Sequence, residues 1–227
     1  MVMEFRNILL ITIGFILDLI FIFVDNKYHN FHSIYLKSLA SLSFVLLALF
    51  NYKTNIQLLL VAALAFDMLG DFILIIRNID QKRRDLLYIL GTIAFLIAHI
   101  LLVIYVLKQY PSSLLFGLIL GFIVFVIIEL FFVLPLVDNK IFIAFGSLYL
   151  FFIILTCSVS IVSYINFPSS SLLVFTIGTV MFTLSDIILV YHKFKKEAPN
   201  ILQPIYRILY FISQVLIAIS LNFNVLK

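Results

Sequence analysis

Long apolar stretches separated by short polar segments recur along the whole chain, and they constrain its fold more than any other feature. Of the 227 residues, 64% are hydrophobic and only 11% are charged, whereas roughly a quarter of the residues in a soluble domain are charged. The stretches lack the apolar and polar alternation of transmembrane β-strands, as residues 58–64 and 122–128 show. The sequence therefore predicts an all-α integral membrane protein and excludes a soluble globular domain.

Each apolar stretch is long enough for one helical crossing of a bilayer, which takes about 20 residues. We therefore expect a polytopic bundle of about eight transmembrane helices in a single domain covering residues 1–227. The first stretch is expected to be retained, because no small-residue cleavage site follows it. The expected spans are 8–24, 34–50, 56–76, 86–107, 114–134, 141–163, 171–192 and 204–222.

The positions of Lys and Arg predict the orientation of the bundle. Eleven of the 15 basic residues fall in or near the connections at one end of an eight-span bundle. By the positive-inside rule, this end faces the cytoplasm and both termini lie on the other side. We expect these basic residues to interact with the lipid bilayer and not with nucleic acid. In a bacterium, the expected location is the inner membrane. The eleven are Lys27, Lys37, Arg77, Lys82, Arg83, Arg84, Lys140, Lys193, Lys195, Lys196 and Arg207.

Residues typical of metal and redox sites are scarce. The single Cys157 lies inside an apolar stretch, so neither an internal disulfide nor a paired-cysteine motif is expected. His29 and His32 have the spacing of metal ligands, but nothing nearby completes a four-ligand site, and we expect them in a polar interfacial loop. Motifs of serine hydrolases and zinc proteases do not occur in the sequence. We expect no metal and no cofactor.

Ionisable side chains inside the spans are few. Each costs on the order of 3 kcal/mol or more, so such residues usually face a bundle interior or a water-filled cavity and mark function. Asp18 and Glu129 each stand alone near the end of a span, where interhelical hydrogen bonding is the simpler interpretation. The other ionisable residues within the spans are Asp67, Asp71, His99 and Asp186.

The rise of an α-helix predicts that two of these aspartates share a layer. At 1.5 Å per residue, Asp71 lies roughly 9 Å from Arg77, and Asp186 lies about 10 Å from Lys193. Asp67 follows one turn deeper than Asp71 on the same face. Asp71 and Asp186 are therefore expected between the cytoplasmic interface and the midplane.

Polar residues of two other spans fall near this layer. His99 is expected roughly 20 Å into its span. Tyr210 and Gln214 lie one turn apart in the last span, at a depth similar to that of the aspartates. These polar side chains, which come from four helices, are therefore expected to converge.

The order and spacing of these residues resemble the YhhN-like lysoplasmalogenases, a family of small eight-span membrane proteins. Each residue alone is common in membrane helices, and only the whole series is specific. The matching residues are Lys37; Phe66, Gly70, Asp71 and Leu74; Gly91, Phe95, His99 and Tyr105; Gly178, Phe182, Ser185, Asp186 and Leu189; and Tyr210 with Gln214.

The resemblance implies a hydrolase that cleaves the vinyl ether bond of lysoplasmalogen, a lysophospholipid, to a fatty aldehyde and glycerophosphoethanolamine or glycerophosphocholine. In this chemistry a proton is transferred to carbon, and water captures the resulting oxocarbenium ion. The step requires one protonated acid and one anionic partner, a division of labour that glycosidases also use. Our hypothesis assigns these roles to Asp71 and Asp186, in either order, and has His99 position water or relay the proton.

The remaining matched residues are expected to bind the substrate. Lys37, expected at the cytoplasmic mouth, would hold the phosphate, and Tyr210 with Gln214 would orient the glycerol. Asp67 and Ser185 are expected to belong to the same pocket. The substrate would enter from the cytoplasmic leaflet, with its tail among Phe-rich helices.

Other functions remain as alternatives. A transporter of ions or small molecules would use the same buried charges, but its polar residues should continue to the far face. Residues 57–66 and 172–182 are largely apolar, which favours a pocket that opens on one side. A zinc-dependent lipid hydrolase would need about three His ligands with an Asp, and a purely structural membrane protein would not need matched aspartates.

Overall fold

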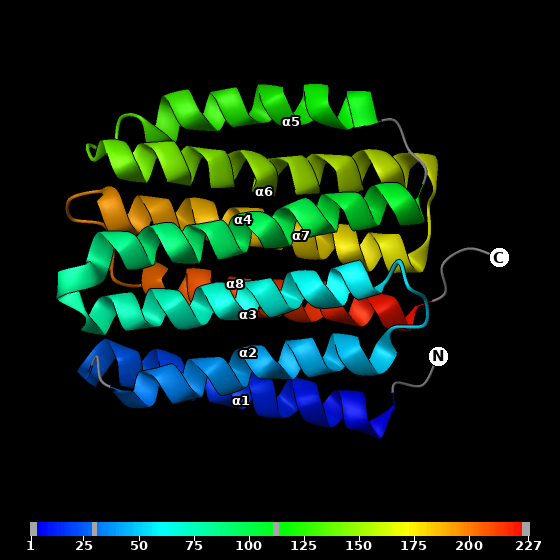
Figure 1. Cartoon of the computed structure of the whole chain (residues 1–227), viewed down its shortest axis with the longest axis horizontal. Coiled ribbons are helices and arrows are strands. Elements are labelled where there is room, and N and C mark those ends of the chain that lie inside the picture. The colour runs from blue at the N-terminus through cyan, green and yellow to red at the C-terminus, as the bar shows by residue number, and fades with distance from the viewer. Residues whose placement is uncertain (1–3, 29–30, 111–113, 224–227) are drawn as a thin grey trace.

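The computed structural model describes residues 4–28, 31–110 and 114–223 (Figure 1). Among these residues, eight helices are long and apolar enough to cross a membrane, which confirms the predicted all-α polytopic bundle. The long helices are α1 (Phe5–Tyr28), α2 (Phe31–Asn51), α3 (Leu58–Ile79), α4 (Arg84–Gln109), α5 (Leu114–Ile128), α6 (Lys140–Asn166), α7 (Ser170–Phe194) and α8 (Leu202–Ile219); short 3-10 helices η1 (Gln81–Arg83) and η3 (Ser220–Asn222) and the π-helical turn η2 (Glu129–Val133) complete the set.

Several helices extend beyond the predicted spans, and α2 shows the consequence most clearly. It begins earlier than predicted, so His32 lies in its first turn, with an exposed side chain, and the expectation of a loop was wrong for this residue. His29 lies outside the described residues.

Lys37 is buried inside the bundle, because Asp18 of α1 and Asp71 of α3 supply ionic partners there.

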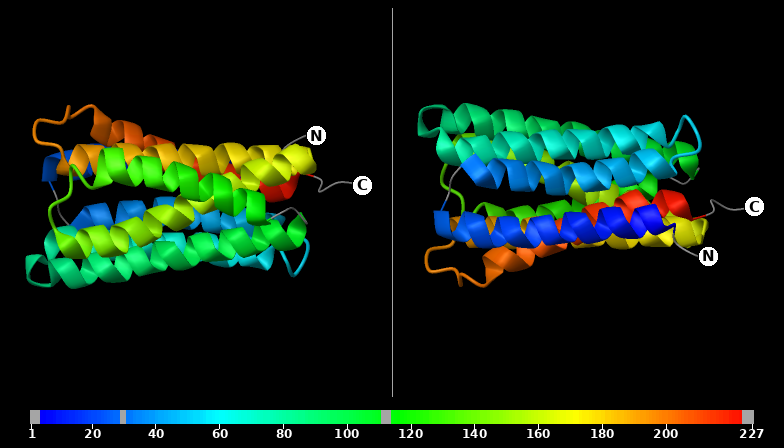
Figure 2. Two further views of the ribbon diagram at one scale, coloured as in Figure 1. Left: turned by 90° about the horizontal axis from the view of Figure 1, so that it is seen from above. Right: turned by 90° about the horizontal axis from the view of Figure 1, so that it is seen from below.

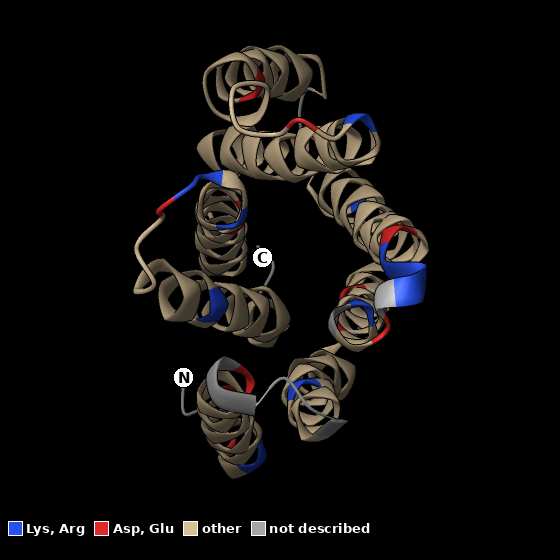
Figure 3. Ribbon diagram, turned by 90° about the vertical axis from the view of Figure 1, so that its left-hand side faces the viewer, with Lys and Arg blue, Asp and Glu red and all other residues tan. Residues whose placement is uncertain are grey.

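Six helices form a closed circuit in the bundle. α2, α3, α4, α6, α7 and α8 contact one another in that order, and α8 returns to α2. α1 lies outside this circuit against α2 and α8 (Figure 2), while α5 packs on α6 at the edge of the molecule (Figure 1). The circuit, seen end on in Figure 3, allows side chains from six helices to share one interior.

Polar side chains cap helices at one end of the bundle. The carboxylate of Asp80 accepts hydrogen bonds from two backbone N–H groups of the turn between α3 and α4. Asn139 caps the first turn of α6 in the same way. Such caps satisfy amide groups that have no partner within the helix, so they fix where these helices begin.

A glycine beside Asp71 lets α3 and α4 approach closely. A Cβ atom on Gly70 would lie 2.6 Å from the ring of Phe95 in α4. That distance is shorter than any normal contact, so a larger residue at position 70 would push the two helices apart. The close approach therefore determines where Asp71 lies relative to α4.

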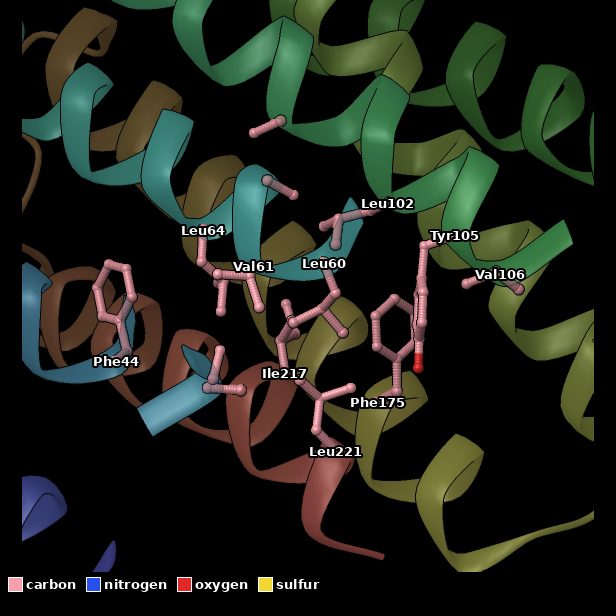
Figure 4. Close-up of a cluster of buried hydrophobic side chains, with 14 of the residues drawn as sticks. Phe44, Leu60, Val61, Leu64, Leu102, Tyr105, Val106, Phe175, Ile217 and Leu221 are labelled. Atoms are coloured by element: carbon pink, nitrogen blue, oxygen red, sulfur yellow. The ribbon is translucent and has the colours of Figure 1, made fainter. Parts of the chain in front are cut away.

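The two ends of the bundle differ in character. Toward the end that carries the termini, apolar side chains fill the interior; Figure 4 shows part of this cluster, including Leu64, Tyr105 and Phe175. The opposite end, which faces the viewer in Figure 3, carries the turns rich in Lys and Arg, and we call it the basic end. Most of the buried Asp, Lys and Arg side chains of the described residues lie in the half of the interior nearer to the basic end.

Candidate active site

A cavity of about 210 Å³ lies inside the helix circuit and extends to the basic end. Seven of the long helices contribute to its wall, together with two residues that follow α5. The cavity brings together five of the eight residues that the sequence singled out. These are Lys37, Asp71, Ser185, Asp186 and Tyr210.

Asp71 is held by three donors. Its Oδ2 atom accepts hydrogen bonds from the hydroxyl groups of Ser41 (2.5 Å) and Tyr210 (3.0 Å). The ammonium group of Lys37 lies 3.6 Å from the same oxygen. Hydrogen bonds and a cation both stabilise the charged form of a carboxyl group, so these three donors offset part of the cost of burying the Asp71 carboxylate as an anion.

Lys37 binds a second carboxylate, that of Asp18. The Lys37 Nζ atom lies 3.5 Å from Asp18 Oδ1, and the side chains of both residues are buried. The interhelical role predicted for Asp18 is therefore correct, but the sequence did not place Asp18 beside the candidate site. Lys37 also lies over the ring of Tyr210, 4.4 Å from its centroid.

Asp186 has a different environment on the other side of the cavity. Its Oδ2 atom accepts a hydrogen bond of 2.7 Å from the hydroxyl group of Tyr149 in α6. Within the described ranges no Lys, Arg or His nitrogen lies within 4.0 Å of Asp186. The two aspartates thus share one cavity, but only Asp71 has a cation at ion-pair distance.

Tyr149 is a cavity residue that sequence reasoning missed. Counting nine residues from Lys140 places it roughly 14 Å from the basic end of α6, close to the layer of the aspartates. The same depth count could therefore have found it. A tyrosine in a membrane helix carries no charge, so the criterion of a charged side chain inside a span does not detect it.

Asp67 and Gln214 form a separate pair one turn deeper. The Gln214 side-chain amide donates a hydrogen bond of 3.0 Å to Asp67 Oδ2, and both side chains are fully buried. Neither residue lines the cavity. The expected convergence of Asp67 and Gln214 is observed, but the structure places them behind the site and gives them no direct access to a molecule in the cavity.

His99 also lies behind the cavity wall. Its Nδ1 atom is 3.2 Å from Thr156 Oγ1, and its ring packs edge to face against Phe182 and Tyr149, at centroid distances of 4.6 and 5.9 Å. It is buried and does not line the cavity. His99 therefore contacts the site through Tyr149, in a position to support that ring.

Ser185 lines the cavity next to Asp186 in the sequence. Its hydroxyl group donates a hydrogen bond of 2.8 Å to the backbone oxygen of Tyr206 in α8. This bond ties α7 to α8 at the level of the site. Glu129, by contrast, accepts a bond of 2.6 Å from Ser147 of α6 and does not line the cavity, in agreement with the interhelical role predicted for it.

Three basic residues line the cavity near its mouth: Arg77 of α3, Lys193 of α7 and Arg207 of α8. From the sequence, these three residues were expected only to determine the orientation of the bundle. Arg207 binds Asp25 at 2.5 Å, and the Arg77 guanidinium group lies 5.5 Å from the centroid of the Tyr88 ring. The cavity therefore combines a carboxylate layer with a cationic mouth.

Apolar side chains form the wall on the side of α5, α6 and α7. They include Val133, Phe142, Leu150, Val190 and Phe194. Three of these, Val133, Leu150 and Val190, also line a small apolar cleft immediately beside the cavity. An apolar chain could lie along this wall while polar groups remain near the aspartates.

The residues that the structure describes offer no cluster of donors for a metal ion. No group of three or more His, Cys, Asp or Glu side chains suited to a metal occurs in these ranges. A zinc-dependent hydrolase of the kind considered above would need such a ligand set.

Comparison with known proteins identifies the family. A model of the YhhN family matches residues 32–221, which is most of the chain, and the chain therefore belongs to this family. No curated protein and no solved structure is significantly similar to it.

Proposed function

We propose that this member of the YhhN family is a membrane-embedded hydrolase that cleaves the vinyl ether bond of lysoplasmalogen. The products would be a fatty aldehyde and glycerophosphoethanolamine or glycerophosphocholine. The observation that carries the proposal is the unequal pair of aspartates in one cavity. Asp71 is bound to a cation and two hydroxyl groups, whereas Asp186 is bound to one tyrosine hydroxyl group.

The reaction requires a proton donor and an anion close together. A carboxylic acid transfers its proton to the vinyl carbon remote from the ether oxygen, and the remaining cation is an oxocarbenium ion. Water adds to the cationic carbon and returns a proton to the carboxylate. The bond from the resulting hemiacetal carbon to the glycerol oxygen then breaks, the glycerol oxygen gains a proton as the new hydroxyl group loses one, and the aldehyde is released.

The different environments of the two aspartates support one assignment of these roles. Asp186 has no ion-pair partner among the described residues, so it is the group that can hold a proton and deliver it. Asp71, in contact with Lys37, remains an anion and stabilises the oxocarbenium ion. Tyr149 fixes the orientation of the Asp186 carboxyl group through its hydrogen bond.

The two regions of the cavity wall match the two halves of the substrate. The apolar side chains of α6 and α7 would contact the hydrocarbon tail, and the opposite, polar side would contact the glycerophosphate head. One apolar wall beside one polar region suits a lipid with a single tail, whose chain would pass the side chains of Val133 and Val190. We also propose that the basic end faces the cytoplasm, with both termini outside it.

The alternative function, transport, requires a different arrangement of the bundle interior. A transported solute needs a path to both faces, through residues that can part. The half of the interior nearer the termini is filled by a large apolar cluster that includes Phe44, Leu102 and Phe175 (Figure 4). This packing favours a pocket with one opening, and therefore hydrolysis over transport.

Aldehyde release by the detergent-purified protein tests the proposal. Lysoplasmalogen should yield aldehyde, and the same lipid with an ester in place of the vinyl ether should yield none. Asp186→Asn and Asp71→Asn should each abolish release while leaving the protein monodisperse. The rate with the wild-type protein should fall in D₂O, because proton transfer to carbon limits it.

Glu129→Gln is the matched control, since Glu129 is an intramembrane carboxyl group outside the cavity wall. This variant should retain activity. Absence of aldehyde from monodisperse wild-type protein, with both head groups and between about pH 5 and 8, the range around which enzymes tune carboxyl groups for such work, would refute the proposed hydrolysis and favour transport.

A further inference from the structure

We propose that Arg77, Lys193 and Arg207 form a binding site for the phosphate group of the substrate at the mouth of the cavity. The inference rests on the proposed function and deepens it, because it makes the phosphate a requirement for good substrates. It also replaces the expectation that Lys37 holds this group.

The three cations come from three helices and line a single cavity. Arg77 and Arg207 are close enough to Lys193 for their charges to repel its ammonium group. Lys193 is exposed, so water relieves part of this repulsion, and an anion between the three groups would relieve the rest. A phosphate group, with its charge spread over several oxygens, is the anion that arginine side chains bind best.

The carboxylates of the described residues do not balance these charges. Arg207 is paired with Asp25, but neither Arg77 nor Lys193 makes an ion pair within the described ranges. The Nε atom of Arg77 and one terminal nitrogen of Arg207 are buried without a hydrogen-bond acceptor. Buried donors of this kind are costly, and reorienting these two side chains toward a phosphate in the cavity that they line would give the donors an acceptor.

Membrane topology alone does not explain the position of Arg77. The positive-inside rule requires basic residues near the ends of spans and makes no demand that they be buried. Arg83 and Lys140, at the same end of the bundle, are exposed, whereas Arg77 is only 8% exposed and lines the cavity. Its burial is explained by a ligand inside the cavity.

Lys37 is a poor candidate for binding phosphate. Its ammonium group already lies between Asp18 and Asp71, and these two carboxylates supply more negative charge than it can neutralise. A phosphate at Lys37 would be repelled by both. The position of Lys37 suits the role of an ionic partner of Asp71.

The spacing of the two layers fits the substrate. Arg77 is six residues from Asp71 and Lys193 is seven from Asp186, which separates the cationic and carboxylate layers by about 9–10 Å along the helices. Six bonds join the vinyl ether carbon to phosphorus and span roughly 7 Å when extended, at the rise per bond of an extended backbone. Long Arg and Lys side chains can cover the remaining distance.

The test compares two substrates that differ only in the phosphate group. Lysoplasmalogen carries the head group, while 1-alkenylglycerol has the same vinyl ether and tail but no phosphate. Arg77→Gln and Lys193→Gln should each lower kcat/KM tenfold or more for lysoplasmalogen and change it less than twofold for 1-alkenylglycerol. Arg83→Gln and Lys140→Gln, the matched controls at the same end, should change neither value. An equal loss for both substrates would overturn the proposal.

Direct binding separates this inference from the hydrolysis on which it rests. A saturated alkyl-ether lysophospholipid, radiolabelled, cannot be cleaved, so its Kd can be measured whether or not the protein is an enzyme. Arg77→Gln and Lys193→Gln should weaken its Kd at least tenfold and leave that of the alkylglycerol unchanged. This result without aldehyde release would support the phosphate site and refute the hydrolysis. Aldehyde release with an unchanged Kd in both variants would support the hydrolysis and refute the phosphate site.

Discussion

The ammonium group of Lys37 lies 3.6 Å from the carboxylate of Asp71. The same ammonium group also binds Asp18, at 3.5 Å, so one cation serves two buried acids. Asp186, across the cavity, has a tyrosine hydroxyl group in place of a cation. This asymmetry is the basis for assigning different roles to the two aspartates.

Replacing Lys37 by Met should reduce both activity and stability. Asp71 and Asp18 would lose their cation, and breaking a buried ion pair costs about 3–5 kcal/mol. We expect aldehyde release to fall at least a hundredfold and the unfolding temperature in detergent to drop. In the double variant Lys37→Met/Asp18→Asn, one uncompensated charge is removed, so stability should partly return while activity should not. Recovery of activity in the double variant would contradict the role given to Lys37.

Replacing Tyr149 by Phe should slow catalysis with little effect on stability. The change removes the 2.7 Å hydrogen bond to Asp186 and keeps the ring that packs against Phe95 and His99. We expect kcat to fall about tenfold to a hundredfold, within the range that a positioned acid contributes, with KM nearly unchanged. Tyr105→Phe, in the apolar half of the bundle, is the control. An unchanged kcat would show that Asp186 needs no such positioning.

The placement of His99 predicts a modest effect of His99→Gln. The side chain is buried behind Tyr149 and Phe182 and does not line the cavity, so it is not expected to contact water or substrate. Aldehyde release should fall less than tenfold, far less than in Asp186→Asn. A loss as large as that of Asp186→Asn would instead support the proton relay expected from the sequence.

A larger side chain on the apolar wall should discriminate between tail lengths. Val190→Phe would fill space where the cavity meets the apolar cleft. We expect kcat/KM for a long-chain lysoplasmalogen to fall tenfold or more, and that for a short-chain analogue to change much less. Leu184→Phe, on the exposed surface of the same helix, should alter neither. Equal losses for both chain lengths would place the tail elsewhere.

The orientation of the bundle can be tested with reporters at the C-terminus. With both termini outside the cytoplasm, alkaline phosphatase fused there should be active in bacterial cells, and a fluorescent protein that folds only in the cytoplasm should stay dark. The reverse pattern would place the basic end outside, against the positive-inside rule.

The sequence predicted the helices well because their signal is local. Each span shows itself by a run of apolar residues, and a membrane leaves few other ways to satisfy the backbone. All eight predicted spans correspond to helices, although α2 begins earlier than expected. The helix rise also placed Asp71 and Asp186 in one layer, and both line the same cavity.

The partners of these residues could not be read in the same way. Depth along a helix follows from counting, but the direction in which a side chain points depends on how helices pack around the circuit. That packing brings Lys37 to Asp18 and Asp71, Tyr149 to Asp186, and Gln214 to Asp67. None of these pairs is close in sequence.

The sequence by itself determined that this chain forms eight membrane helices, with Asp71 and Asp186 toward the basic end, because hydrophobicity and helical rise act along the chain. Only the tertiary structure decided which of those residues share a cavity. Among the described residues it placed a cation beside Asp71 and none at ion-pair distance from Asp186, and it turned Arg77 inward while leaving Arg83 exposed. The physical reason is that ion pairing and burial depend on distances between helices, which are set by packing across the whole bundle.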